Sequence, residues 1–301
     1  MDCDNLPSTK FTGLCSNKWK NLKPVLRPTQ SAIGYAWAST KLEDFDSENN
    51  AQAGIDDNII PAIIGPEMFV YAVDHHHELC ALDYSGFEDV KVTVNIIADY
   101  RTMKVDDFWD RLLKEKYVYT LMRPSGEPNT LPTEGKFGDL PSNFSWDSFV
   151  DDPFRSIASF VRKVDNSTCK DEFDLSDTCM RCYIRNCDST GNGIPFFEFR
   201  WGYFFNDAYI NEKYWPSSAL YKAFTKSYEK IGNQMEKIDV KVDRDSWDDV
   251  ADSLISLCRY DDTVSQYDLD DSLFVGGGKL PGAMVGWEPI EEDDPTCGLD
   301  K

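Results

Sequence analysis

Apolar and polar residues alternate most regularly between Val90 and Ala98, where the sequence VKVTVNIIA predicts a β-strand with one buried face. Two shorter apolar runs precede it, at residues 59–64 and 68–73. The turn signal Gly65-Pro66 separates these two runs, so they predict a hairpin of adjacent strands.

Apolar residues at helical spacing predict several helices. The pattern is clearest over residues 105–116 (VDDFWDRLLKEK), whose acidic start and basic end also suit the helix dipole. A helix over residues 31–45 is expected to begin after Thr29 as its N-cap. The other predicted helices cover residues 78–82, 151–164, 217–235 and 246–258.

These elements predict an α+β fold, with a mixed first half and a mainly helical second half. A polar arm (1–25) precedes a core domain (26–164), within which residues 46–58 read as an acidic loop. A cysteine-rich insertion follows (165–193), then a helical extension that continues the core (194–260) and an acidic irregular tail (261–301).

Composition narrows the choice of partners. Hydrophobic residues make up 41% of the 301 residues, which is typical of a globular protein. Lysine and arginine total 31 against 53 acidic residues, a net charge of -22 that repels phosphates at long range. We therefore expect no nucleic-acid partner. No apolar run approaches the roughly 18 residues of a membrane span, so we expect no membrane partner either.

Nine cysteines are present, and Cys80 falls in a predicted buried helix. The other eight lie near the chain ends or in one cluster, an arrangement that suits disulfides. Together with glycosylation sequons at Asn143 and Asn166, they favour a secretory-pathway or extracellular protein. Free thiols in a cytoplasmic protein, or a zinc site in the cluster, are the alternatives. The eight residues are Cys3, Cys15, Cys169, Cys179, Cys182, Cys187, Cys258 and Cys297.

Several blocks follow one another in the order typical of a single family. The longest is IPAIIGPEMFVYAVDHHHELCAL, residues 60–82. Pro28-Thr29-Gln30 precedes it, and Phe108-Trp109, the block 152–156 (DPFRS) and the block 195–201 (PFFEFRW) follow. In these blocks the chain resembles the ParB-like nuclease family, a branch of the ParB/sulfiredoxin fold. The resemblance implies a mixed sheet with flanking helices, followed here by a mainly helical C-terminal extension.

The chain also departs from related families. ParB proteins that bind a nucleoside triphosphate carry a Gly-Glu-Arg-Arg turn, and related folds use Asp-Gly-His-His-Arg. This chain has Asp74-His75-His76-His77 instead, without the glycine or the arginine. The resemblance therefore does not extend to a nucleotide-driven partition switch, and the word nuclease is a family label.

The three histidines are the only ones in the chain and are adjacent, between a predicted strand and a predicted helix. A helix N-terminus presents free N–H groups and a positive dipole end, which suit a phosphate or a carboxylate. We expect His76 and His77 to act as general acid or base, and Asp74 to cap the helix or orient a ring. A capped helix with exposed histidines and no ligand is the structural alternative.

Four more residues are candidate ligand contacts beside His75. Lys41 is placed near the histidine turn by the resemblance and would meet a phosphate as a point charge. Arg155 could hold a phosphate bidentately, although a local pair with a neighbouring aspartate is the simpler reading. Glu198 and Arg200 share a side if their segment is a strand, where they could pair with each other.

A metal site is the competing use of the same turn. His75 and His77 share a side in an extended turn, and a carboxylate from elsewhere would complete the ligand set of a divalent ion. The sequence predicts an enzyme that hydrolyses or transfers phosphoryl groups of a phosphorylated small molecule or nucleotide. A metal-dependent lyase or hydratase, a ParB-like nuclease and a non-catalytic secreted binding protein are the alternatives.

Overall fold

The computed structural model describes residues 2–3, 6–122, 133–163, 197–214, 217–231 and 241–258. The chain divides into two units. The first comprises Met1–Arg123, Thr133–Asp151 and Lys237–Lys241, and the second comprises Pro124–Pro132, Asp152–Glu236 and Val242–Lys301. The boundary falls at residues 151 and 152, whereas the sequence predicts a core that continues to residue 164.

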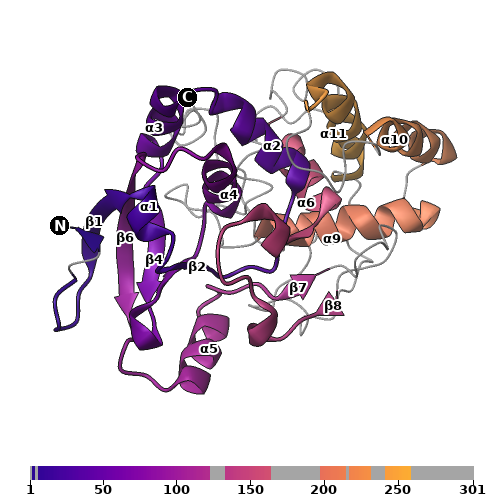
Figure 1. The fold of residues 1–301 in the computed structure, drawn as a ribbon. Coiled ribbons are helices and arrows are strands. Elements are labelled where there is room, and N and C mark those ends of the chain that lie inside the picture. Colours follow the sequence, from indigo (N-terminus) through magenta and orange to yellow (C-terminus); the bar gives the residue numbers. More distant parts are fainter. Residues whose placement is uncertain are drawn as a thin grey trace, which may run out of the picture. The chain divides into compact units, whose positions relative to one another are not determined.

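A five-stranded mixed sheet forms the centre of the first unit (Figure 1). Two neighbouring pairs are antiparallel, β1 with β6 and β4 with β5. The other two pairs are parallel, β4 with β6 and β2 with β5. This topology confirms the α+β class and the predicted hairpin. In spatial order the strands are β1 (Gly13–Lys18), β6 (Lys91–Asp99), β4 (Ile60–Ile64), β5 (Val70–Ala72) and β2 (Leu26–Pro28).

Successive residues of β4 point to opposite faces of the sheet, and each face packs against helices. Ala62 and Ile64 belong to the larger apolar core, which the side chains of four helices complete. Ile63 belongs to a smaller core with Phe108 and Leu112 of α5 (Val105–Lys114). The four helices are α1 (Trp19–Leu22), α2 (Tyr35–Asp44), α3 (Glu48–Asp56) and α4 (His76–Ser85).

The second unit is helical in its described part. Helix α6 (Pro153–Val161) begins after Asp152, whose carboxylate accepts the N–H groups of Phe154 and Arg155, as an N-cap does. It packs against α9 (Phe197–Ile210) and α11 (Arg244–Cys258), and α11 packs against α10 (Ser218–Ile231). Helices α5, α6, α10 and α11 confirm the corresponding predictions from apolar spacing.

The remaining elements are short. Strands β7 (Leu121–Met122) and β8 (Thr133–Glu134) pair with each other, as do β3 (Ala32–Ile33) and β9 (Val150–Asp151). Single 3-10 turns occur at Pro66–Met68, Phe137–Asp139, Trp146–Ser148 and Glu212–Tyr214.

The acidic loop expected over residues 46–58 is wrong, because residues 48–56 form helix α3. Ser47 caps this helix by accepting the N–H of Asn50. Ala51 and Ile55, four residues apart and therefore on one face, are buried in the core. The burial of Ala51 and Ile55 and the Ser47 cap thus stabilise a helix in a segment that is otherwise polar.

The predicted start of the helix over residues 31–45 is also wrong. Helix α2 begins at Tyr35, after Gly34, and Ala32–Ile33 form strand β3 instead. Thr29 does not cap it, because its hydroxyl donates to the carbonyl of Ala72 at 2.9 Å. Pairing with β9 holds residues 32–33 in an extended conformation, which the local sequence does not reveal.

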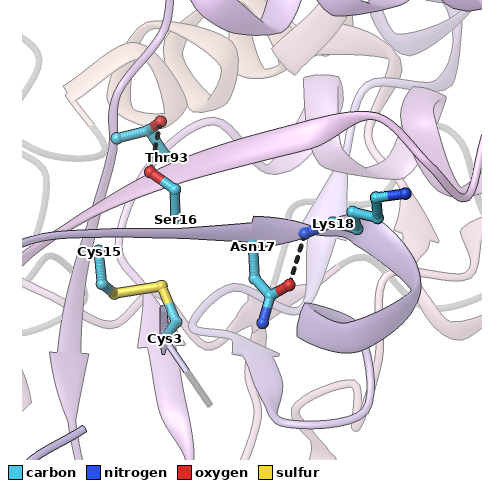
Figure 2. Close-up of a disulfide and its surroundings, with 6 residues drawn as sticks. All are labelled: Cys3, Cys15, Ser16, Asn17, Lys18 and Thr93. Carbon is cyan, nitrogen blue, oxygen red and sulfur yellow. Dashed lines mark hydrogen bonds between the residues drawn. A yellow bond between two sulfur atoms is a disulfide. The ribbon is translucent and has the colours of Figure 1, made fainter. Parts of the chain in front are cut away.

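The N-terminal segment, expected to be a polar arm, contains an edge strand and a disulfide. Strand β1 pairs with β6, and Ser16 and Thr93 hydrogen-bond across the pair at 3.0 Å. Figure 2 shows the disulfide between Cys3 and Cys15 next to this strand, with both cysteines buried. One of the expected disulfides is therefore present. Of the other candidates, the side chain of Cys258 and all of Cys169, Cys179, Cys182, Cys187 and Cys297 lie outside the described residues.

Asp99 anchors the N-terminal segment, because its carboxylate accepts the N–H of Phe11 at 2.9 Å. It also forms a buried ion pair with Arg101, which donates to the carbonyl of Pro7 at 2.7 Å. Burial by itself would raise the pKa of Asp99, but the hydrogen bonds from Arg101 and Phe11 outweigh it and hold the pKa below its usual range.

We expect Asp99→Asn to lower the free energy of unfolding by about 1–2 kcal/mol at neutral pH, because the amide keeps one acceptor but loses the charge. A carboxyl with a depressed folded pKa stabilises above its unfolded pKa, and this contribution is lost as the pH falls through the folded pKa. Urea unfolding of both proteins at pH 7 and pH 3 checks this: the gap should narrow at pH 3. A gap that stays constant or widens would contradict the role of Asp99.

Candidate functional site

The four residues Asp74 to His77 join strand β5 to helix α4. Asp74 is exposed, and its Oδ1 accepts the N–H of His75 at 2.7 Å. His75 has a φ of 63°, in the left-handed region that a non-glycine residue occupies at a cost of roughly 1 kcal/mol. Helix α4 then begins at His76. The histidine turn therefore lies at a helix N-terminus, as the sequence predicts.

His76 is buried, with 2% of its surface exposed. Its Nε2 atom accepts the backbone N–H of Thr29 at 3.0 Å. Thr29 follows β2 directly, and its hydroxyl bonds the carbonyl of Ala72 at the end of β5. The ring of His76 is thus part of the connection between the ends of two parallel strands.

His77 has the same arrangement with a different partner. It is 8% exposed, and its Nε2 atom accepts the backbone N–H of Gly34 at 2.9 Å. A ring nitrogen that accepts a hydrogen bond carries no proton, so both His76 and His77 are neutral with the proton on Nδ1 in this geometry. The two rings hold residues 29–34 against the histidine turn.

The carboxylate of Glu78, only 5% exposed, lies beside His75. Its Oε2 is 3.1 Å from Nδ1 of His75, and its Oε1 accepts the side-chain N–H of Asn58 at 3.1 Å. The amine of Lys41 is 3.9 Å from the same Oε1. A buried carboxylate needs such partners, because an uncompensated buried charge is costly. We call these four residues the Glu78 cluster.

The Glu78 cluster joins three segments and is partly accessible to solvent. Lys41 comes from α2, Asn58 from the segment just after α3, and His75 and Glu78 from the start of α4. The side chains of Lys41 and His75 are 30% and 26% exposed. The prediction that Lys41 lies near the histidine turn is therefore confirmed.

Sequence reasoning missed Glu78 and Asn58. Glu78 is three residues after His75 at a predicted helix start, a spacing that places both on one face, so a signal was available. No local signal marks Asn58, because its partner Glu78 lies 20 positions later in the chain.

The other predicted ligand residues lie in the second unit. Arg155 forms an ion pair with Glu198, as does Arg162, and Arg155 also bonds Ser159. Glu198 lies in helix α9, so the condition that it share a strand face with Arg200 is not met. The side chain of Arg200 lies outside the described residues. All three stay predictions as ligand contacts.

The geometry of the histidine turn also bears on a metal site and on Cys80 as a reactive thiol. Within the described part of the chain, no group of three or more His, Cys, Asp or Glu side chains is arranged to hold a metal ion. Coordination through Nε2 of His77 would break its bond to Gly34. Cys80 is a free thiol buried in α4, and burial raises its pKa, which confirms its predicted place in the core.

None of the helices in the described segments has both the length and the apolar character that a membrane crossing requires.

Comparison with known proteins supplies the remaining findings. The family model described as "Putative ParB-like nuclease" matches residues 23–176, just over half of the chain. Among solved structures, the crystal structure of protein Atu1540 from Agrobacterium tumefaciens is similar, with a TM-score of 0.47 and 22% sequence identity. The match covers 73% of this chain and 88% of that chain. No protein with a curated description matches.

Proposed function

The chain belongs to the ParB-like nuclease family, and from this premise we propose that it binds a phosphorylated small molecule or nucleotide at the histidine turn and acts on it by hydrolysis or phosphoryl transfer. The observation that carries the proposal is the Glu78 cluster. It brings a lysine and a histidine, both partly exposed, to one point at the start of a ten-residue helix.

The groups at the start of α4 favour the binding of an anion. The first backbone N–H groups of α4 lie at the positive end of the helix dipole, where phosphates are stabilised. Lys41 adds a full positive charge, and the His75 ring supplies nitrogen donors or acceptors. Glu78 keeps both side chains in place, while Asp74 constrains the turn by accepting the N–H of His75.

A small ligand fits the charge of the chain better than a nucleic acid does. With a net charge of -22, most of the surface repels a polyanion, and a duplex would have to approach that surface. A compact phosphate ester needs only the local positive charge of the turn. The family description nevertheless makes nuclease activity the second candidate.

We expect Lys41→Met to weaken the binding of a phosphorylated ligand about tenfold, the effect of losing one charge-assisted contact. The probes are inorganic pyrophosphate and ATP, each titrated into the full-length protein by calorimetry and tested for a rise in melting temperature. Lys23→Met is the matched control, because Lys23 is similarly exposed but pairs with Asp83, near the far end of α4, and with Glu88.

Several results would overturn the proposal. Failure of both pyrophosphate and ATP to bind the wild type and to raise its melting temperature at millimolar concentration would contradict it. Equal losses in the Lys41 and Lys23 variants would show a general charge effect instead of a site. Cleavage of supercoiled plasmid in Mg²⁺ or Mn²⁺, without binding of the small probes, would favour the nuclease.

A further inference from the structure

The three histidines have different surroundings, and the difference assigns them different roles. We propose that His75 is the proton-transferring residue of the histidine turn and that Glu78 is its positioning residue. This inference rests on the proposed function and deepens it, because it names the group that would carry the chemistry of the same site.

The two rings beside His75, those of His76 and His77, are already engaged in structural hydrogen bonds. Nε2 of His76 and Nε2 of His77 each accept a backbone N–H within the core. Proton uptake at either atom would replace that bond with a repulsive contact between two N–H groups. Their use in holding residues 29–34 therefore opposes their use as a base.

His75 differs in both accessibility and partner. Its side chain is 26% exposed, whereas the rings of His76 and His77 are nearly buried. Its Nδ1 faces a carboxylate at 3.1 Å. A carboxylate at this position selects the tautomer with the proton on Nδ1, which makes Nε2 the basic atom of the ring.

Glu78 is itself held in place by two groups from other segments. Asn58 donates to its Oε1 at 3.1 Å, and the Lys41 amine lies 3.9 Å from that oxygen. Its Oε2 is the atom that faces His75. One carboxylate oxygen is thus used for anchoring and the other for orienting the ring, which is the arrangement that a positioning residue requires.

The reaction expected at this site is hydrolysis of a phosphate ester by water. The oxygen of a water molecule forms a bond to phosphorus while the bond from phosphorus to the leaving oxygen breaks, and the leaving oxygen keeps the electron pair. Nε2 of His75 takes the proton that the water gives up, and the resulting imidazolium is stabilised by the carboxylate of Glu78. Solvent later protonates the leaving group and receives the proton from His75.

Nitrogen NMR of the imidazole rings tests the positioning directly, since the chain has only three histidines. In the ¹⁵N-labelled full-length protein we expect all three neutral rings to carry the proton on Nδ1. Glu78→Ala should remove this preference from His75 alone. Glu78→Gln, which keeps the shape, should give a mixture of tautomers at His75, because an amide can donate as well as accept. Asn58→Ala should shift the His75 signals in the same direction, by less.

The control is Glu88→Gln, which changes an exposed glutamate that pairs with Lys23. It should leave all three rings unchanged. A His75 ring that keeps its wild-type tautomer in both Glu78 variants would overturn the positioning role, and so would equal changes at all three histidines.

Addition of inorganic pyrophosphate to the same samples separates this inference from the proposed function. Both are supported if pyrophosphate binds and shifts the His75 ring signals more than those of His76 and His77. Binding that leaves the His75 ring unchanged would overturn the role of His75 and leave the binding proposal standing. Absence of binding by pyrophosphate and by ATP would overturn both.

Discussion

Replacing His76 with alanine is expected to lower the free energy of unfolding by about 3 kcal/mol. The backbone N–H of Thr29 would lose its acceptor inside the core, and a buried N–H without an acceptor costs about 1–3 kcal/mol. The cavity left by the ring adds to this cost, because His76 also packs against Phe144, with ring centroids 5.9 Å apart. Urea unfolding followed by circular dichroism measures the change.

The neighbouring histidines supply matched comparisons. His77→Ala should have a similar effect through Gly34, whereas His75→Ala, at a partly exposed position, should cost less than about 1 kcal/mol. His76→Gln should recover part of the loss, since its side-chain oxygen can take the place of Nε2. Equal effects of alanine at all three positions would contradict the roles assigned to the rings.

Loss of the disulfide between Cys3 and Cys15 is expected to cost about 3 kcal/mol. The bridge closes a loop with a sequence separation of 12, and cross-links of that size restrict the unfolded chain by an amount of this order. The double substitution Cys3→Ala and Cys15→Ala tests this, with the free energy of unfolding measured with and without a reductant.

The reductant distinguishes this bridge from any other cysteine pair. If Cys3–Cys15 provides the stabilisation, reduction should lower the stability of the wild type to that of the double variant and leave the variant unchanged. A variant as stable as the oxidised wild type would contradict the expected contribution. The ion pair of Asp99 with Arg101 and the bond from Arg101 to Pro7 should keep part of the N-terminal segment attached even without the bridge.

The elements that could be predicted are those whose cause is local. In β6 the alternation of Val92, Val94 and Ile96 with polar residues directly encodes a strand with one buried face, and these three residues are buried. In α5, Phe108 and Leu112 lie one helical turn apart and are buried together. The pattern was sufficient because each element buries one regular stripe of side chains.

The elements that were missed depend on distant partners. Strand β1 has few apolar residues, and it exists because its backbone pairs with β6, about 80 residues later. Strand β3 forms through pairing with β9, more than 100 residues away. Backbone hydrogen bonds of this kind depend little on side-chain identity, so no local pattern reports them.

The candidate site also has one feature that the local sequence predicts and one that it does not. Its place was readable, since three adjacent histidines after an apolar strand and before a helix mark a turn at a helix N-terminus. The roles of the individual rings were not, because their partners Thr29 and Gly34 lie 47 and 43 residues earlier. The parallel pairing of β2 with β5 brings that segment beside the turn.

By itself, then, the sequence determined the α+β class, the amphipathic helices, the family resemblance and the position of the histidine turn, because short-range periodicity and contiguous motifs encode each of them. Only the tertiary structure decided that Glu78 joins His75 and Lys41, and that His76 and His77 bond to backbone N–H groups. The physical reason is that a hydrogen bond depends on the distance between two atoms in the folded chain, and that distance is set by sheet pairing across tens of residues.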